Sequence, residues 1–294
     1  MTVTAAPILA RRMLARQLRE LRANSGVSAE TARAKIGVAK QTLWRMETGQ
    51  FVRLNPLFIE GLCEMYGASE GVTSMLLELT EEARATGWWH EFGDVLPKSC
   101  ELFTGLEDAA KRITSYQTTL LPGLLQTEEY HRALIWLRAP TMPVAEVERR
   151  IEMLNRRKAR LYHPVHPRSL HVVIDETALR RAIGGRTVMA EQLNYLADAG
   201  ELPHVCVQVV PLSVEAYSGL VIGSFELLEF PRHLTARLTE PPVVHLQGYT
   251  GAEYLERIDE VQRYQQAYIE LQRSSLDELH SRWLLREIAK ESAT

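Results

Sequence analysis

The chain has 294 residues, of which 46% are apolar and 24% charged. This is the composition of an ordinary globular protein, and at roughly 100 to 200 residues per domain it predicts two domains. No stretch approaches the ~18 apolar residues of a membrane span, and the first ten residues lack a signal-peptide pattern, so we expect a cytoplasmic protein without membrane association. The three cysteines are dispersed and have no metal-ligand spacing, which argues against a disulfide framework or a zinc site.

The net charge of −3 is unevenly distributed along the chain. Residues 1–54 contain ten Lys or Arg against three acidic residues, a net of +7, and the rest of the chain has a net of −10. Such a contrast favours a polyanion-binding N-terminal segment on an acidic body. Solvated arginines on a surface helix are the alternative explanation.

Five helices are expected in the N-terminal segment. Apolar spacing and stop signals place them at about 8–23, 28–35, 38–47, 56–66 and 69–85. The second and third helices are joined by a short turn containing Gly37, which predicts a helix-turn-helix. In the third helix we expect Leu43 and Met46 in the core, Trp44 in the core or against the backbone, and Glu47 in a structural role.

The third helix and the turn after it have a recognisable pattern. Residues 37–49 read Gly-Val-Ala-Lys-Gln-Thr-Leu-Trp-Arg-Met-Glu-Thr-Gly. This string resembles the recognition helix and exit turn of XRE-type (lambda-repressor-like) regulators, although Ala39 stands where the family usually has a Ser or Thr helix cap. The resemblance implies that this helix lies in the major groove of double-stranded DNA, with its N-terminal side chains on base edges.

This placement assigns roles to the polar residues of the segment. Base contacts are expected from the polar side chains of the third helix, namely Lys40, Gln41, Thr42 and Arg45. Phosphate contacts are expected from Arg12, Arg16, Arg33, Lys35 and Arg53. For each of them, a solvated surface side chain is the alternative.

A mixed pattern follows the Gly87-Trp88-Trp89-His90 string. Helices are expected at 106–116, 128–138, 144–162, 176–183, 187–199, 251–273 and 276–290, and strands at 170–174, 205–210, 220–230 and 243–246. The expected fold is therefore mainly α with an α+β body. Its domains are a five-helix helix-turn-helix domain (1–86), a connector (87–104) and a larger mixed α/β domain with C-terminal helices (105–294).

The body also resembles a known family. Matching strings occur in order at 87–89, 105–107, 121–130 (Leu-Pro-Gly-Leu-Leu-Gln-Thr-Glu-Glu-Tyr), 175–181, 192–193, 207–211 and 223–225. They resemble the Scr1-type, antitoxin-like C-terminal domain of actinobacterial XRE regulators such as the WhiJ group. The resemblance implies a DNA-binding regulator that is often encoded beside a small partner protein.

Two strings in the body contain residue types that can support catalysis or bind a metal. Asp175-Glu176 follows a strand and opens a helix, so we expect a helix cap rather than acid-base or metal chemistry. Prolines interrupt His163, His166 and His171, which favours exposed loop histidines over a metal site. We therefore expect no enzymatic activity, no metal and no cofactor.

A ligand wall or a domain seam is a separate possibility for the body. The candidate residues are Trp88, Trp89, Tyr116, Leu124, Gln126 and Tyr130, and core packing is the alternative.

Together these patterns predict a sequence-specific transcription regulator, a repressor that binds a near-palindromic operator as a homodimer. Its C-terminal domain is expected to dimerise and to receive a small-molecule effector or a protein signal. The alternative is an antitoxin-like protein that sequesters a small partner protein and binds DNA for autoregulation.

Overall fold

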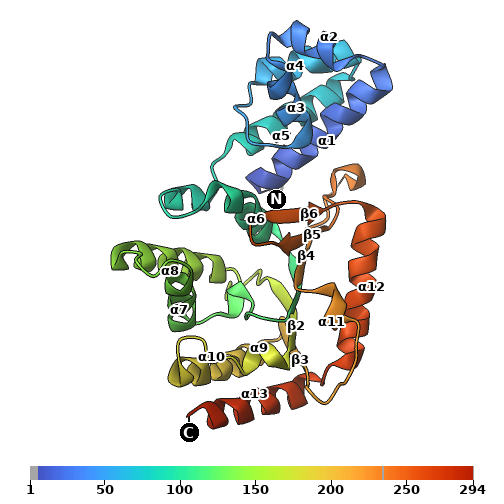
Figure 1. Ribbon diagram of the computed structural model, residues 1–294. Coiled ribbons are helices and arrows are strands. Elements are labelled where there is room, and N and C mark those ends of the chain that lie inside the picture. The colour runs from blue at the N-terminus through green and yellow to red at the C-terminus, as the bar shows by residue number, and fades with distance from the viewer. Residues whose placement is uncertain (1–5, 234, 294) are drawn as a thin grey trace. The chain divides into compact units, whose positions relative to one another are not determined.

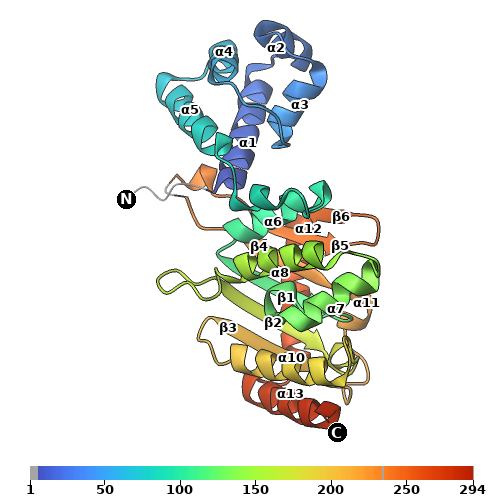
Figure 2. The ribbon, with the colours of Figure 1, turned by 90° about the vertical axis from the view of Figure 1, so that its left-hand side faces the viewer.

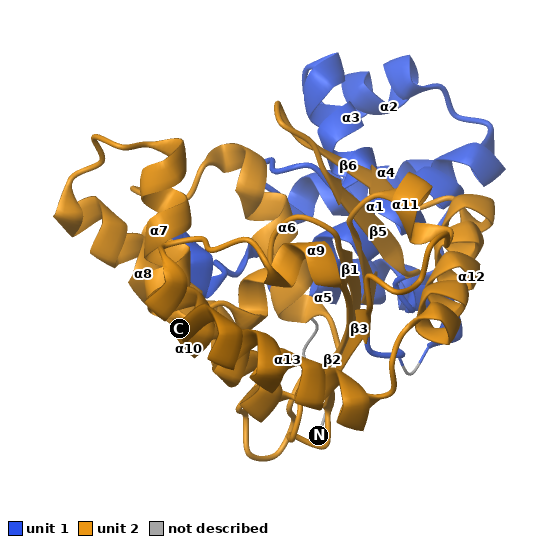
Figure 3. Ribbon diagram, turned by 60° about the horizontal axis from the view of Figure 1, so that its bottom comes forward, with its two compact units in different colours: residues 1–91, 231–240 blue, residues 92–230, 241–294 orange. Residues whose placement is uncertain are grey.

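The computed structural model describes residues 6–233 and 235–293, which form two compact units (Figure 3). Unit 1 comprises residues 1–91 and 231–240, and unit 2 comprises 92–230 and 241–294. The segment 231–240 thus belongs to unit 1, whereas the expected boundaries put it in the C-terminal domain. Residues 1–5, part of the N-terminal stretch without a signal-peptide pattern, lie outside the described residues.

Unit 1 is helical, as expected. Its helices are α1 (Pro7–Ser25), α2 (Ala29–Ile36), α3 (Lys40–Thr48), α4 (Pro56–Tyr66) and α5 (Glu70–Arg84), followed by the 3₁₀ turn η1 (Trp88–Phe92) (Figure 1). The helices are amphipathic, and α1 packs along α5. The apolar faces of the helices meet in a core that includes Leu18, Leu43, Ile59, Leu62 and Leu76.

The turn between α2 and α3 depends on a glycine. Gly37 has φ 67°, a left-handed conformation that is strained for residues with a Cβ. Its N–H closes the last turn of α2, and α3 begins three residues later, at Lys40. This short connection gives the expected helix-turn-helix.

Unit 2 contains one six-stranded mixed sheet with the strand order β3-β2-β1-β4-β5-β6. Strands β1, β2 and β3 are parallel, and β4, β5 and β6 continue the sheet antiparallel. The strands are β1 (Arg112–Gln117), β2 (Ser169–Asp175), β3 (Val205–Val210), β4 (Phe225–Glu229), β5 (Val243–Gln247) and β6 (Ala252–Leu255).

Helices cover both faces of this sheet. The helices of unit 2 are α6 (Lys98–Ala109), α7 (Glu128–Arg138), α8 (Val144–Lys158), α9 (Glu176–Leu179), α10 (Arg186–Ala199), α11 (Gly219–Ile222), α12 (Ile258–Ser274) and α13 (Glu278–Ala293). The 3₁₀ turn η2 (Gly123–Leu125) also belongs to unit 2, whereas η3 (Ala236–Leu238) lies in the 231–240 segment of unit 1. Helices α7, α8 and α10 lie on one face and α12 on the other (Figures 1 and 2). Helix α13 packs against α10 and β3.

Buried salt bridges and apolar contacts hold these layers together. On the α12 face, Tyr116, Phe225 and Leu271 belong to one apolar cluster. At α6, Glu107 accepts two hydrogen bonds from Arg157 of α8, at 2.8 and 2.7 Å. Burial acts to raise the pKa of Glu107, but the adjacent Arg157 outweighs it and holds that pKa below its usual value.

The fold class is confirmed, and several element boundaries are corrected. The expected helix 106–116 is wrong, because α6 ends at Ala109 and 112–117 form the central strand β1. The expected strand 220–230 is split into α11 and β4. The expected helix 251–273 begins only at Ile258, since 252–255 pair with β5 as strand β6. Within the expected connector 87–104, the structure has η1 and the start of α6.

Candidate nucleic-acid interface

Helix α3 presents most of the expected base-reading residues on one exposed face. Lys40, Gln41 and Arg45 are exposed, whereas Thr42 is partly buried. The opposite side packs into the core through Leu43 and Met46, as expected. With 3.6 residues per turn, the arc from Lys40 to Arg45 spans about 140° of the helix circumference, and Thr42 lies outside it.

The expectation for Trp44 is wrong. It is 52% exposed. On the helix circumference it lies between Lys40 and Arg45, inside the exposed arc. Sequence reasoning assigned it to the core because large aromatic side chains are usually buried. The signal that could have found it is its spacing, four residues after Lys40 and three after Gln41, on the polar side of the helix.

Two arginines of α1 contact α3 and the loop that follows it. Glu47 is buried and accepts hydrogen bonds from Arg22 at 2.6 and 2.8 Å, which confirms its structural role. This pairing raises the pKa of Arg22 above its ordinary value. Arg11 donates to the carbonyls of Val52, at 2.9 Å, and Ala83, at 3.0 Å. Helix α3 and the loop after it are therefore held on α1.

The expected phosphate contacts Arg12 and Arg16 are paired inside unit 1. Both bind the carboxylate of Glu240, at 2.5 and 3.0 Å, and Arg16 also donates to the carbonyl of Thr239. The Glu240 side chain is fully buried. Both arginines are consequently held by one carboxylate of the 231–240 segment, whose negative charge offsets one of their two positive charges.

The three other expected phosphate contacts are more accessible. Arg33 pairs with Glu30 of its own helix, and Lys35 with Glu64 at 3.2 Å. Both are surface pairs, which contribute little and open readily. Arg53 is exposed. Over the described part of the chain, Arg53, Lys40 and Arg45 have no ion-pair partner.

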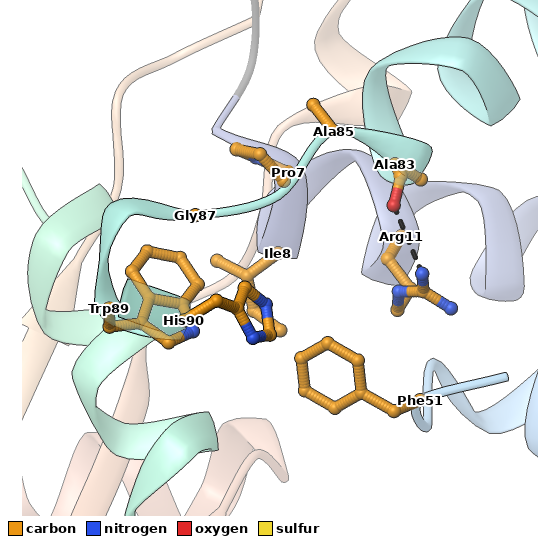
Figure 4. Close-up of a pocket in the computed structure, with 9 residues that line it drawn as sticks. All are labelled: Pro7, Ile8, Arg11, Phe51, Ala83, Ala85, Gly87, Trp89 and His90. Carbon is orange, nitrogen blue, oxygen red and sulfur yellow. Dashed lines mark hydrogen bonds between the residues drawn. The ribbon is translucent and has the colours of Figure 1, made fainter. Parts of the chain in front are cut away.

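A small cavity in unit 1 is lined by the start of α1, Phe51 and residues between 83 and 90 (Figure 4). Its volume is about 10 Å³, enough for one water molecule at most. Trp89 is buried in its wall, and a Cβ on Gly87 would lie 2.3 Å from the Trp89 ring. The cavity is therefore a packing defect and has no room for a ligand.

The other residues considered for a ligand wall or seam do not form one site. Leu124, Gln126 and Tyr130 come together beside α8. There the side-chain amide of Gln126 donates to the carbonyl of Leu121 at 2.7 Å, and the main-chain carbonyl of Gln126 accepts from Lys158 at 2.8 Å. Tyr116 faces the α12 cluster instead. Trp88 and Trp89 belong to unit 1.

The carboxylates at the end of β2 are engaged by neighbouring groups. Asp175 accepts the backbone N–H of Thr177 at 2.8 Å and caps α9, and the hydroxyl of Tyr217 also donates to it. Glu176 accepts from the N–H of Leu212 at 2.8 Å and pairs with Arg180. Both side chains are thus used to hold the loops that follow β2 and β3.

Sequence reasoning missed a cavity of about 280 Å³ at the edge of unit 2. Its lining includes His171 of β2, Cys206 of β3 and, from α13, Glu278 and Arg282. Burial, followed by the nearby Glu278, raises the pKa of Cys206 to about 12, so its thiol stays protonated near neutral pH. These residues are far apart in the sequence, and no local pattern connects them.

Two family models match the chain, one in its N-terminal part and one in the rest. A helix-turn-helix domain model matches residues 13–75, and the model described as a domain of unknown function (DUF5753) matches residues 100–287. The second match covers more than half of the chain, so the protein belongs to the DUF5753 family. Neither the curated proteins nor the solved structures gave a match. In the described residues, no helix is both long and apolar enough to cross a membrane.

The helix-turn-helix domain and the exposed polar face of α3 identify the chain as a DNA-binding regulator.

Proposed function

We propose that the chain is a sequence-specific transcriptional repressor that binds a near-palindromic operator as a homodimer in the cytoplasm. The supporting observation is the set of exposed polar side chains on α3. Lys40, Gln41 and Arg45 have no ion-pair or hydrogen-bond partner for their side chains among the described residues, while most other cations of unit 1 are paired internally. Two-fold pairing of subunits sets the half-sites about one helical turn of DNA apart.

Two variants with matched chemistry test this function. Arg45→Ala removes an unpaired arginine of α3, and Arg138→Ala removes an exposed arginine of α7 in unit 2. On an operator selected with the full chain, we expect Arg45→Ala to lose about 1 to 3 kcal/mol of binding free energy and to relax specificity at one base position. Arg138→Ala is expected to bind like the wild type. Equal behaviour of both variants would contradict the proposal.

We propose that unit 2 dimerises and receives the signal, without enzymatic activity. The cavity beside His171 and Cys206 has a volume of about 280 Å³, close to the lower end of the range for small-molecule sites, and is the candidate effector site. Asp175 and Glu176 support a non-catalytic body because both hold neighbouring loops. An effector that changes operator affinity in the full chain, and no longer does so in an Arg282→Ala variant, would support this assignment.

The second candidate is an antitoxin-like role of the Scr1 and WhiJ type, typical of actinobacterial regulators. Leu279 and Trp283, one turn apart on α13, are both more than 60% exposed. They favour a small protein partner encoded beside the gene, with DNA binding for autoregulation. Co-expression with the neighbouring gene products tests it: the complex should form with the wild type and weaken in Trp283→Ala.

A further inference from the structure

We propose that Trp44 contacts the 5-methyl group of a thymine in the major groove, and thereby specifies a T·A pair in each half-site. The inference rests on the proposed function, because it requires α3 to enter the groove. It assigns sequence specificity to an apolar contact with a thymine methyl group, whereas arginine, lysine, glutamine and asparagine read bases through hydrogen bonds.

The position of Trp44 on α3 is the first argument. At roughly 100° per residue, Trp44 lies about 40° from Lys40 and about 100° from Arg45. It is therefore well inside the arc whose two ends are Lys40 and Arg45. A surface that contacts both Lys40 and Arg45 therefore also covers the indole of Trp44. Its 52% exposure leaves enough ring surface for such a contact.

The second argument is that unit 1 itself offers the indole no partner. Another exposed aromatic side chain of this unit, Phe51, is contacted by the guanidinium of Arg11 at 5.2 Å and by the ring of His90 at 6.0 Å. Within the described residues the Trp44 indole makes neither a ring contact nor a hydrogen bond, and the hydroxyl of Thr48 donates to its main-chain carbonyl. In the described part of unit 1, no ring contact or hydrogen bond therefore occupies the exposed part of the indole.

The chemistry of the groove supplies the third argument. Base edges in the major groove present hydrogen-bond donors and acceptors, and the one apolar group among them is the methyl group of thymine. An indole facing those edges desolvates polar atoms at every base pair, and only at a thymine does it also bury a methyl group. The favoured partner of Trp44 is thus a thymine.

Replacing thymine by uracil tests the inference, because it removes the methyl group and keeps the base pair. Each thymine of a selected operator is replaced in turn by deoxyuridine, and binding of the full chain is measured. At one thymine per half-site, we expect the wild type to bind about fourfold more weakly, the loss for one methyl group removed from an apolar contact. Trp44→Ala is expected to bind both operators equally at that position.

Two controls complete the experiment. Tyr249→Ala removes a fully exposed aromatic side chain of unit 2, and it should retain the wild-type response to uracil. Trp44→Phe should retain part of that response. Circular dichroism shows whether each variant is folded.

The outcomes separate this inference from the proposed function. If the wild type binds the operator specifically but tolerates uracil at every position, the inference about Trp44 is wrong and the proposed function stands. The same holds if Trp44→Ala and the wild type respond to uracil alike. If the chain selects no DNA sequence at all, the proposed function itself fails.

Discussion

Replacing Glu240 by Gln removes the negative charge that holds Arg12 and Arg16. The Glu240 side chain is fully buried, and the two arginine side chains are 12% and 20% exposed. Removing one member of a buried ion pair costs about 3 to 5 kcal/mol. Because both arginines keep some contact with solvent, we expect the lower end, about 3 kcal/mol. Urea unfolding followed by tryptophan fluorescence measures this loss against the wild type.

The same pairing predicts which cations of unit 1 reach DNA phosphates. Each phosphate contact contributes about −0.9 to the slope of log affinity against log salt concentration. Arg16→Gln should leave this slope unchanged, because Arg16 is held by Glu240. Arg53→Gln should make the slope shallower by about 0.9, since Arg53 is exposed and unpaired among the described residues.

Anisotropy titrations of a labelled operator between about 50 and 200 mM salt measure these slopes. Over this range, phosphate contacts change the affinity by about 10³ to 10⁵. A slope reduced by about 0.9 in Arg16→Gln would refute the reasoning, because Arg16 would then leave Glu240 for a phosphate in the complex. Unchanged stability of Glu240→Gln would refute the buried pairing itself.

Three further predictions concern stability. Glu107→Ala leaves the buried guanidinium of Arg157 unpaired, so we expect a loss of about 3 to 5 kcal/mol in urea unfolding. Burial, followed by nearby cations of α8, lowers the pKa of His131 to about 4. The unfolded chain therefore takes up a proton that the folded chain does not, and stability should fall by about 2 to 3 kcal/mol as the pH drops from about 6.5 to 4. His131→Gln should remove this part of the pH dependence, and an unchanged pH profile would contradict it. Gly87→Ala places a methyl group against the buried ring of Trp89 and should cost about 1 to 3 kcal/mol; a melting temperature equal to that of the wild type would show that the ring can move.

The helices of unit 1 could be predicted from the sequence because local signals agree there. Ser28 accepts the N–H of Thr31 as a helix cap, and Pro56 begins α4. Gly37 and Gly49 end α2 and α3 with positive φ. Apolar periodicity connects these start and stop signals. Each boundary thus follows from residues a few positions apart.

The central strand β1 could not be predicted, and its position in the sheet explains why. Strands β2 and β4 flank it, and four consecutive residues, 113–116, are buried. Without alternation between an exposed and a buried face, the strand has no period of two. Nothing between Ala109 and Arg112 separates it from α6, since Gly and Pro are both absent there. A continuous helix was therefore the simpler interpretation of the pattern.

The candidate site was predicted unevenly for similar reasons. Lys40, Gln41 and Arg45 follow from helical spacing within one short segment, and the structure places all three on the exposed side of α3. The partner of Arg12 could not be predicted in this way, because Glu240 lies 228 residues further along the chain. A pairing over that distance depends on the tertiary fold, and no local pattern indicates it.

The 231–240 segment also bears on how such regulators can evolve. The chain passes between the two units at 91/92, 230/231 and 240/241. A recombination event that exchanges residues 1–91 alone would bring in a new α1 without the carboxylate that its arginines had paired with, or would leave Glu240 buried without a cation. Each outcome carries the cost of an unpaired buried charge. Exchange of residues 1–91 alone is therefore expected to destabilise unit 1, whereas point substitutions on the exposed face of α3 leave this ion pair intact.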